Sequence, residues 1–134
     1  MTNSGGGGAA GDPPLVTIVD DDESVRKSTC RLIRSFGYRA EAFGSGPEFL
    51  SSPAAKQTAC LVLDVRMPGV DGLEVQRRVT AEGLDIPIVF ISGRASDDEE
   101  RRARSAGAVD FLRKPVDTAT LRRLLHEIVS QRRP

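Results

Sequence analysis

The chain has 134 residues, which is enough for one domain around a single hydrophobic core. Its nineteen basic residues balance nineteen acidic ones, so no overall charge favours binding to nucleic acid or to a membrane surface. No apolar run approaches the roughly 18 residues that a transmembrane helix needs, and the first four residues lack the basic and apolar regions of a signal peptide. We therefore expect a cytoplasmic protein that has neither nucleic acid nor a membrane as a direct partner.

The N-terminal residues 1–13 are expected to form a disordered tail, because residues 5–11 are all glycine or alanine. This run does not match a phosphate-binding loop, since it neither follows a strand nor opens a helix. The remaining residues 14–134 are expected to form the folded domain. Its two cysteines, Cys30 and Cys60, fall within apolar patterns, so both are expected to be buried, reduced thiols.

Five strands are expected, each followed by a helix. The expected strands cover residues 15–19, 38–43, 59–63, 86–91 and 109–112. The helices are expected to begin after the acidic residues 20–22, at a capping box in residues 45–48, after the turn at residues 68–69, at residue 97 and at residue 117. Gly37, Gly83 and Gly107 are expected to end the first, third and fourth helices. Asp22 and Glu23 are interpreted as the N-cap and a first-turn acid of the first helix.

The strand of residues 59–63 is apolar throughout, which indicates that helices cover both of its faces. Short connections and the alternation of strands with helices favour a parallel sheet. We therefore expect an α/β fold of the (βα)5 type, with a doubly wound five-stranded parallel sheet. Ligands of such sheets bind beyond the carboxyl ends of the strands, so the residues just after each strand are the candidates for function.

Charged or hydroxyl side chains follow four of the five strands. They are Asp20 and Asp21 after the first strand, Asp64 at the end of the third, Ser92 at the end of the fourth and Lys114 after the fifth. Crowded carboxylates repel one another, and each resists ionisation unless a cation compensates. Mg²⁺, or Mn²⁺ in its place, suits such a site because it prefers oxygen ligands and needs only one or two carboxylates. Lys114 would then be the counter-ion of an anion bound beside the metal.

Four motifs in this order resemble the receiver domain of two-component response regulators, the CheY-like superfamily. The motifs are residues 19–22, 63–72, 91–93 and 114–115. Residues 20–28 and 106–111 are similar to receivers that, in nitrogen-fixation regulators, precede a LuxR-type helix-turn-helix DNA-binding domain. The resemblance runs from about residue 15 to residue 128. It implies a flavodoxin-like sheet with the strand order 2-1-3-4-5.

The resemblance also assigns roles around the acidic residues. It implies that Asp64 is the phosphoacceptor, which receives a phosphoryl group from the phosphohistidine of a sensor histidine kinase. Asp21 would bind Mg²⁺ directly and Asp20 mainly through water. Asp64 and the backbone carbonyl of Arg66 would complete the protein's ligands to the metal.

Further residues match the family's switch positions. Lys114 would contact the phosphoryl oxygens, and Ser92 would donate a hydrogen bond to the phosphate once it is attached. Phe111 matches the switch aromatic, which would rotate inward and change the surface built from the fourth helix, the fifth strand and the last helix. Arg66 and Arg94 stand two residues after Asp64 and Ser92, where the family tunes the rate of dephosphorylation.

Two enzyme or ligand-binding readings compete with the receiver. A haloacid-dehalogenase-like phosphatase also uses Mg²⁺ and an aspartate nucleophile, but it needs a second acid two residues later, where this chain has Arg66. A flavin or nucleotide binder of flavodoxin shape would not place three aspartates after the first strand, since they would repel phosphate. We expect a single-domain response regulator, not an enzyme, that signals through contact with another protein or through phosphorylation-induced dimerisation.

Overall fold

The computed structural model describes residues 12–132, so the expected disordered tail lies outside the described residues except for its last two positions. The five strands are β1 (Leu15–Val19), β2 (Arg39–Phe43), β3 (Thr58–Leu63), β4 (Ile88–Ser92) and β5 (Asp110–Arg113). The five α-helices are α1 (Glu23–Ser35), α2 (Gly46–Leu50), α3 (Gly72–Ala81), α4 (Asp97–Ser105) and α5 (Thr118–Arg132). A 3₁₀ helix, η1 (Pro53–Lys56), precedes β3 and was not anticipated from the sequence.

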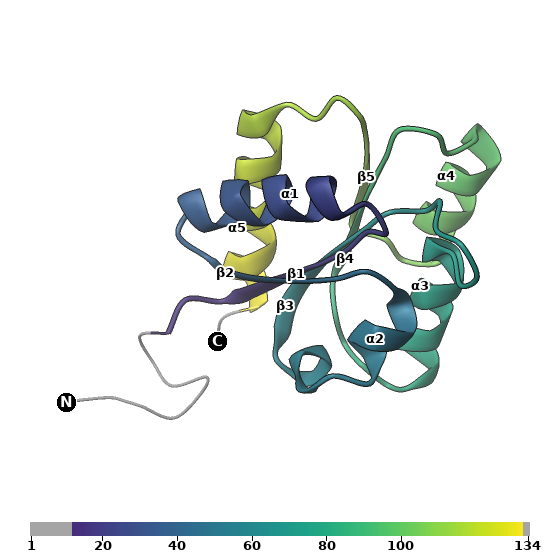
Figure 1. Ribbon diagram of the computed structural model, residues 1–134, viewed down its shortest axis with the longest axis horizontal. Coiled ribbons are helices and arrows are strands. Elements are labelled where there is room, and N and C mark those ends of the chain that lie inside the picture. The colour runs from purple at the N-terminus through teal and green to yellow at the C-terminus, as the bar shows by residue number, and fades with distance from the viewer. Residues whose placement is uncertain (1–11, 133–134) are drawn as a thin grey trace.

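The strands form one parallel sheet in the order β2-β1-β3-β4-β5, as the resemblance implied. In Figure 1, α1 and α5 lie on one side of the sheet, whereas α2, α3 and α4 lie on the other. The fold is therefore the doubly wound α/β arrangement expected from the alternation of strands and helices. Among the described residues, no helix is both long and apolar enough to cross a membrane.

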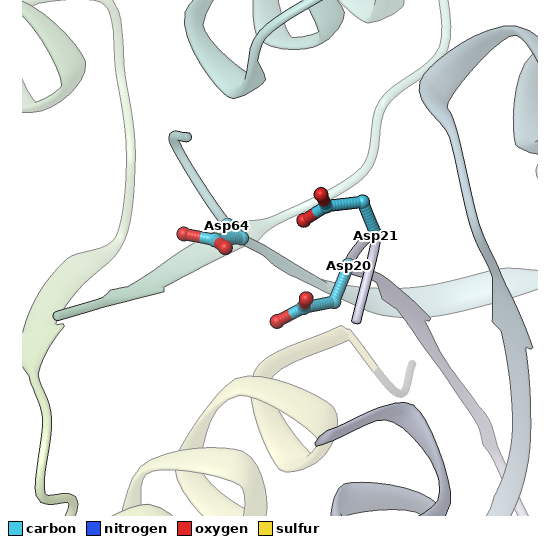
Figure 2. A group of neighbouring side chains, drawn as sticks. All are labelled: Asp20, Asp21 and Asp64. Atoms are coloured by element: carbon cyan, nitrogen blue, oxygen red, sulfur yellow. The ribbon is translucent and has the colours of Figure 1, made fainter. Parts of the chain in front are cut away.

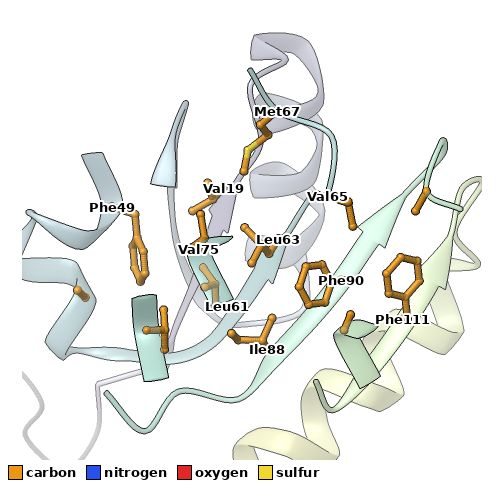
Figure 3. Packing of buried hydrophobic residues seen from close by; sticks show 14 residues of the cluster. Val19, Phe49, Leu61, Leu63, Val65, Met67, Val75, Ile88, Phe90 and Phe111 are labelled. Atoms are coloured by element: carbon orange, nitrogen blue, oxygen red, sulfur yellow. The ribbon is translucent and has the colours of Figure 1, made fainter. Parts of the chain in front are cut away.

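The central strand β3 explains why the core has two halves. Side chains alternate between the two faces of a strand, and all four residues from Cys60 to Leu63 are buried. Leu61 and Leu63 join the cluster under α2, α3 and α4, part of which Figure 3 shows. Cys60 and Val62 pack instead with α1 and α5. Because burying a large aliphatic side chain contributes about 1.5–3 kcal/mol, a strand buried on both faces anchors both helix layers.

The expected helix caps are largely present. Asp22 accepts hydrogen bonds from the N–H groups of Ser24 and Val25 at 2.9 and 3.2 Å, so it is the N-cap of α1 as predicted. At α2, Ser45 accepts a bond from the Glu48 N–H at 3.3 Å, which is one of the two hydrogen bonds of the expected capping box.

Strand starts are the least accurate part of the sequence interpretation. β4 begins at Ile88, two residues later than expected: Pro87 has no N–H to donate to the sheet, although its carbonyl accepts a bond from the Leu61 N–H at 2.9 Å. β5 begins at Asp110, which leaves Val109 before the strand with 46% of its surface exposed. β4 and β5 also end one residue later than expected, at Ser92 and Arg113, so the candidate site residues still lie at or just after the carboxyl ends of the strands.

Candidate functional site

Three carboxylates meet beyond the carboxyl ends of two neighbouring strands. Val19 of β1 is paired with Leu63 of β3, so the next residues along the chain, Asp20 and Asp64, occupy matching positions. One ligand oxygen from each of Asp20, Asp21 and Asp64 lies within 4.8 Å of the others, and Figure 2 shows the three side chains gathered in one place. The prediction that these acids come together is confirmed.

The surroundings of Asp20 make its negative charge costly. Only 5% of this residue is exposed, and its burial raises the pKa of the Asp20 carboxyl above its ordinary value, with the negative charges of Asp64 and Asp21 acting in the same direction. A hydrogen bond of 2.9 Å from the Asp22 N–H and the ammonium of Lys114 oppose this effect without cancelling it. The cluster therefore has the charge and the oxygen donors that suit a divalent cation.

Lys114, the residue directly after β5, lies next to the acidic cluster. Its N–H donates to the carbonyl of Ser92 at 3.1 Å, which fixes the end of β5 against β4. Its Nζ atom then lies 3.7 Å from Oδ2 of Asp20. Lys114 and the three carboxylates line one cavity of about 390 Å³, so an anion bound beside the carboxylates would meet an ammonium group there.

Arg94, two residues after the end of β4 at Ser92, lines this cavity. Ser92 is completely buried, and its Oγ accepts a long hydrogen bond of 3.4 Å from the Arg94 N–H. Arg94 lines the cavity that contains Asp64 and also a second cavity of about 400 Å³ that includes Asp21 and Arg66. Both arginines predicted to tune dephosphorylation thus lie beside the acidic cluster, while their roles stay predictions.

The loop after β3 holds Asp64 by two backbone contacts. The N–H of Asp64 donates to the carbonyl of Val19 at 3.1 Å, and the N–H of Arg66 donates to Oδ1 of Asp64 at 3.4 Å. The guanidinium of Arg66 points to α4, where it lies 2.9 Å from Oε1 of Glu99. The role of the Arg66 carbonyl as a metal ligand stays a prediction.

Gly72 packs against the backbone of Asp64. The sequence analysis did not identify that this position requires glycine. A Cβ atom at position 72 would lie 2.2 Å from the carbonyl oxygen of Asp64 and 2.9 Å from Cα of Val65, both in the backbone. The only signal in the sequence is a glycine in the first turn of a helix, where glycine is otherwise unfavourable. The start of α3 therefore packs directly on the backbone that presents Asp64.

We expect Gly72→Ala to destabilise the protein by about 1–3 kcal/mol, because the backbone must move to admit the methyl group. Urea unfolding measures this change. Gly93→Ala is the matched control, since a Cβ there would meet only Lys114 carbons at 3.6 Å, an ordinary contact. Equal stability of the two variants would contradict the tight packing at position 72.

The ring of Phe111 is already inside the protein. Phe111 is 4% exposed and stacks on Phe90 with 5.5 Å between ring centroids and 18° between planes. Both rings are labelled in Figure 3. The described conformation therefore has a buried Phe111 ring, while its rotation on activation stays a prediction.

An arginine network that the sequence analysis did not single out joins α4 to β5. Arg113 donates to the carbonyl of Ala95, lies 2.9 Å from Oε1 of Glu100 and covers the Phe111 ring at 5.3 Å. Arg104 lies 3.0 Å from Glu100 and donates to the Phe111 carbonyl at 3.3 Å. Because α4 has an acidic first turn and β5 ends in a base, the sequence indicated an electrostatic attraction between the two elements, but it did not indicate which residues pair.

We expect Arg113→Met to lower the free energy of unfolding by about 1–2 kcal/mol, because the Ala95 carbonyl loses a donor and Glu100 loses a cation. Chemical denaturation provides the measurement. Arg101→Met is the control, since Asp98, on the solvent-exposed surface of the same helix, is the only acidic partner of Arg101 within residues 12–132. A loss in the control as large as that in Arg113→Met would rule out a special role of the network.

Comparison with known proteins places this site in a family. The sequence profile described as "Response regulator receiver domain" matches residues 16–126. The chain therefore belongs to the response regulator receiver domain family, the phosphoacceptor units of two-component systems. Family membership favours the receiver over the phosphatase and the flavin-binding alternatives, and an acidic cluster of this kind is typical of the family's Mg²⁺ site.

Individual relatives agree with this assignment. Nodulation protein W of Bradyrhizobium diazoefficiens is 47% identical over 92 residues, which are 69% of this chain and 40% of that protein. Transcriptional regulatory protein FixJ of the same organism is 33% identical over 111 residues, 83% of this chain and 54% of that protein. The crystal structure of FixJ-N has a TM-score of 0.80 at 32% identity and covers 90% of this chain and 96% of that one. The chain thus spans about half of the length of these curated relatives.

Proposed function

We propose that Asp64 accepts a phosphoryl group from the phosphohistidine of a sensor histidine kinase, in the presence of Mg²⁺ or Mn²⁺. The observation that carries this proposal is the meeting of three carboxylates within 4.8 Å, with the Lys114 ammonium beside them. Asp20, Asp21, Asp64 and the backbone carbonyl of Arg66 would hold the ion. When bound, the ion supplies positive charge that offsets the carboxylate repulsion and the charge on the phosphoryl oxygens.

In the proposed transfer, a carboxylate oxygen of Asp64 attacks the phosphorus atom in line with the histidine nitrogen. The P–O bond forms as the P–N bond breaks, and the bonding pair returns to the imidazole, which then takes up a proton. Such transfer depends mostly on positioning and on charge stabilisation. Here the backbone bonds to Val19 and Arg66 position Asp64, and the Lys114 ammonium, which lines the same cavity, would hold the transferred oxygens.

We propose that the attached phosphoryl group then acts on β4 and β5. Ser92 would turn its hydroxyl to donate to the new oxygens, in place of the long bond that it accepts from Arg94. Ser92 and Phe90 both belong to β4, and Phe90 stacks on Phe111 of β5. A movement of Ser92 would therefore be transmitted through these packed side chains to the surface of α4, β5 and α5. The phosphoryl group would act as a ligand that shifts populations between two conformations.

The proposed output is a contact of the α4–β5–α5 surface with a downstream protein or with a second copy of the chain. Because the curated relatives are about twice as long as the matched region, the output of the whole protein belongs to this proposal and does not follow from the family. We place the reaction in the cytoplasm, where ATP feeds sensor kinases and where the two buried cysteines would stay reduced. Arg66 and Arg94 would tune the lifetime of the phosphoryl group, because both line the cavity of about 400 Å³ beside the acidic cluster and would control the access of water from it.

The direct test is to incubate the protein with acetyl phosphate and to measure its intact mass with Mg²⁺ and with a chelator. We expect the mass of one added phosphoryl group with Mg²⁺ and none with the chelator. Fragmentation after borohydride reduction, which marks an acyl phosphate, should place the addition at residue 64. No addition in the presence of Mg²⁺, or addition at another residue, would overturn the proposed function.

A further inference from the structure

Arg66 connects the candidate phosphoacceptor to helix α4. Its backbone N–H donates to Oδ1 of Asp64, while its guanidinium lies 2.9 Å from Oε1 of Glu99 in the first turn of α4. One residue therefore contacts the carboxylate that would be phosphorylated and a helix that belongs to the proposed output surface. The family role assigned to position 66, tuning of dephosphorylation, does not account for this ion pair.

Glu99 is fixed in place by its own helix. Its Oε1 accepts a hydrogen bond of 2.9 Å from the Ser96 N–H, and its N–H donates to Oγ of Ser96 at 3.0 Å, so the two residues form a capping box. The side chain of Glu99 is 15% exposed, whereas that of Arg66 is 47% exposed. Arg66 is therefore the partner that can leave, because Glu99 keeps its cap without the guanidinium.

The space next to the Arg66 guanidinium leads to the acidic cluster. Arg66 lines the cavity of about 400 Å³ that also includes Asp21 and Arg94, and these two residues line the cavity that contains Asp64 as well. A phosphoryl group brings a charge of about −1.5 to −2 and three acceptor oxygens. A guanidinium binds such a group with two parallel hydrogen bonds. The phosphoryl group would therefore be a stronger partner of Arg66 than the single carboxylate oxygen of Glu99 is.

We propose that Arg66 exchanges partners on phosphorylation: its guanidinium leaves Glu99 and binds the phosphoryl oxygens on Asp64. This inference rests on the proposed function of Asp64. The exchange releases the first turn of α4 from the loop after β3, and it leaves that turn held by its cap and by Arg113. Asp64 is thereby coupled to α4 by a route that does not pass through Ser92. Because Glu99 and the phosphoryl group compete for one cation, Glu99 opposes the phosphorylated state, and this coupling is reciprocal.

The test uses Glu99→Gln, which removes the charge but keeps the capping box, since glutamine serves equally at that position. Beryllium trifluoride, a mimic of the phosphoryl group on aspartate, is the probe, and its affinity in the presence of Mg²⁺ is measured by calorimetry. We expect Glu99→Gln to bind it about three- to fivefold more tightly, the size that a partly exposed ion pair allows. Asp98→Asn is the control, because it removes the same charge from the same helical turn, where Asp98 contacts Arg101 and not Arg66.

A double-mutant cycle separates partner exchange from a general effect of charge. In the Arg66→Gln background, Glu99→Gln should no longer raise the affinity for beryllium trifluoride, because residue 99 and the phosphoryl mimic then have no guanidinium for which to compete. A gain that persists in that background, an equal gain in Asp98→Asn, or no gain at all would overturn the exchange while leaving the proposed function intact. Wild-type protein that fails to bind beryllium trifluoride with Mg²⁺ would overturn both.

Discussion

Asp64→Asn is expected to abolish phosphorylation while the domain stays folded. An amide oxygen is a far weaker nucleophile than a carboxylate oxygen, and no other carboxylate in the cluster replaces Asp64 at the end of β3. The substitution preserves shape, and asparagine keeps an oxygen that can accept the Arg66 N–H. Intact mass after incubation with acetyl phosphate and Mg²⁺ should show one phosphoryl group on the wild type and none on the variant, at equal stability to urea.

Asp71→Asn provides the matched control for this experiment. Asp71 lies beside the same region, lining the cavity of Arg66 and Arg94, but it serves as the N-cap of α3 through a bond of 2.9 Å from the Glu74 N–H. Asparagine caps helices as well as aspartate does, so full phosphorylation of this variant is expected. Complete labelling of Asp64→Asn, or its loss of folded structure, would contradict the assignment of Asp64 as a phosphoacceptor that is not needed for folding.

The position of the acidic cluster could be predicted because it depends on a few local patterns. The apolar runs that end at Val19 and Leu63 are followed by acids, and a parallel sheet brings such ends to one edge. The partnership of β1 with β3 came from the family resemblance and not from these patterns, since five strands can be ordered in many ways. Once that order is given, the meeting of Asp20 with Asp64 follows from the register of the two strands.

The arginine contacts could not be predicted, because a long side chain chooses its partner in three dimensions. Arg66 reaches Glu99 on α4, which lies 33 residues further along the chain. Arg113 reaches Ala95 and Glu100, which precede it by 18 residues or fewer. The family resemblance suggested a role of Arg66 in dephosphorylation but no partner for its guanidinium. The same limit applies to Phe111, whose burial was predictable but whose stacking on Phe90 was not.

Asp20→Asn is expected to stabilise the metal-free protein and to weaken its binding of Mg²⁺. Burial and the charges of Asp64 and Asp21 raise the pKa of the Asp20 carboxyl above 3.8, its ordinary value. The folded state therefore binds this proton more tightly than the unfolded state does. The associated stability is fully present below the unfolded pKa and is lost as the pH rises through the folded pKa. At neutral pH an ionised Asp20 thus costs stability, and a neutral amide of the same shape removes that cost.

The expected gain for Asp20→Asn in a chelator at pH 7 is about 1 kcal/mol in the free energy of unfolding, since asparagine can still accept the Asp22 N–H. With excess Mg²⁺ the order should reverse. The wild type gains stability from a ligand that binds only the folded state, whereas the variant should bind Mg²⁺ at least about tenfold more weakly. Urea unfolding with chelator and with Mg²⁺ measures both effects in one series.

Asp22→Asn distinguishes this cost from a general benefit of removing negative charge. Asp22 stands two residues from Asp20, but bonds from the Val25 N–H and from Ser24 lower the pKa of its carboxyl, so its charge favours the folded state. Its replacement should give no gain in chelator and should leave the response to Mg²⁺ unchanged, because asparagine keeps the N-cap. If Asp20→Asn proved less stable than the wild type in chelator, or responded fully to Mg²⁺, then the repulsion within the acidic cluster would not be what draws a cation to the ends of β1 and β3.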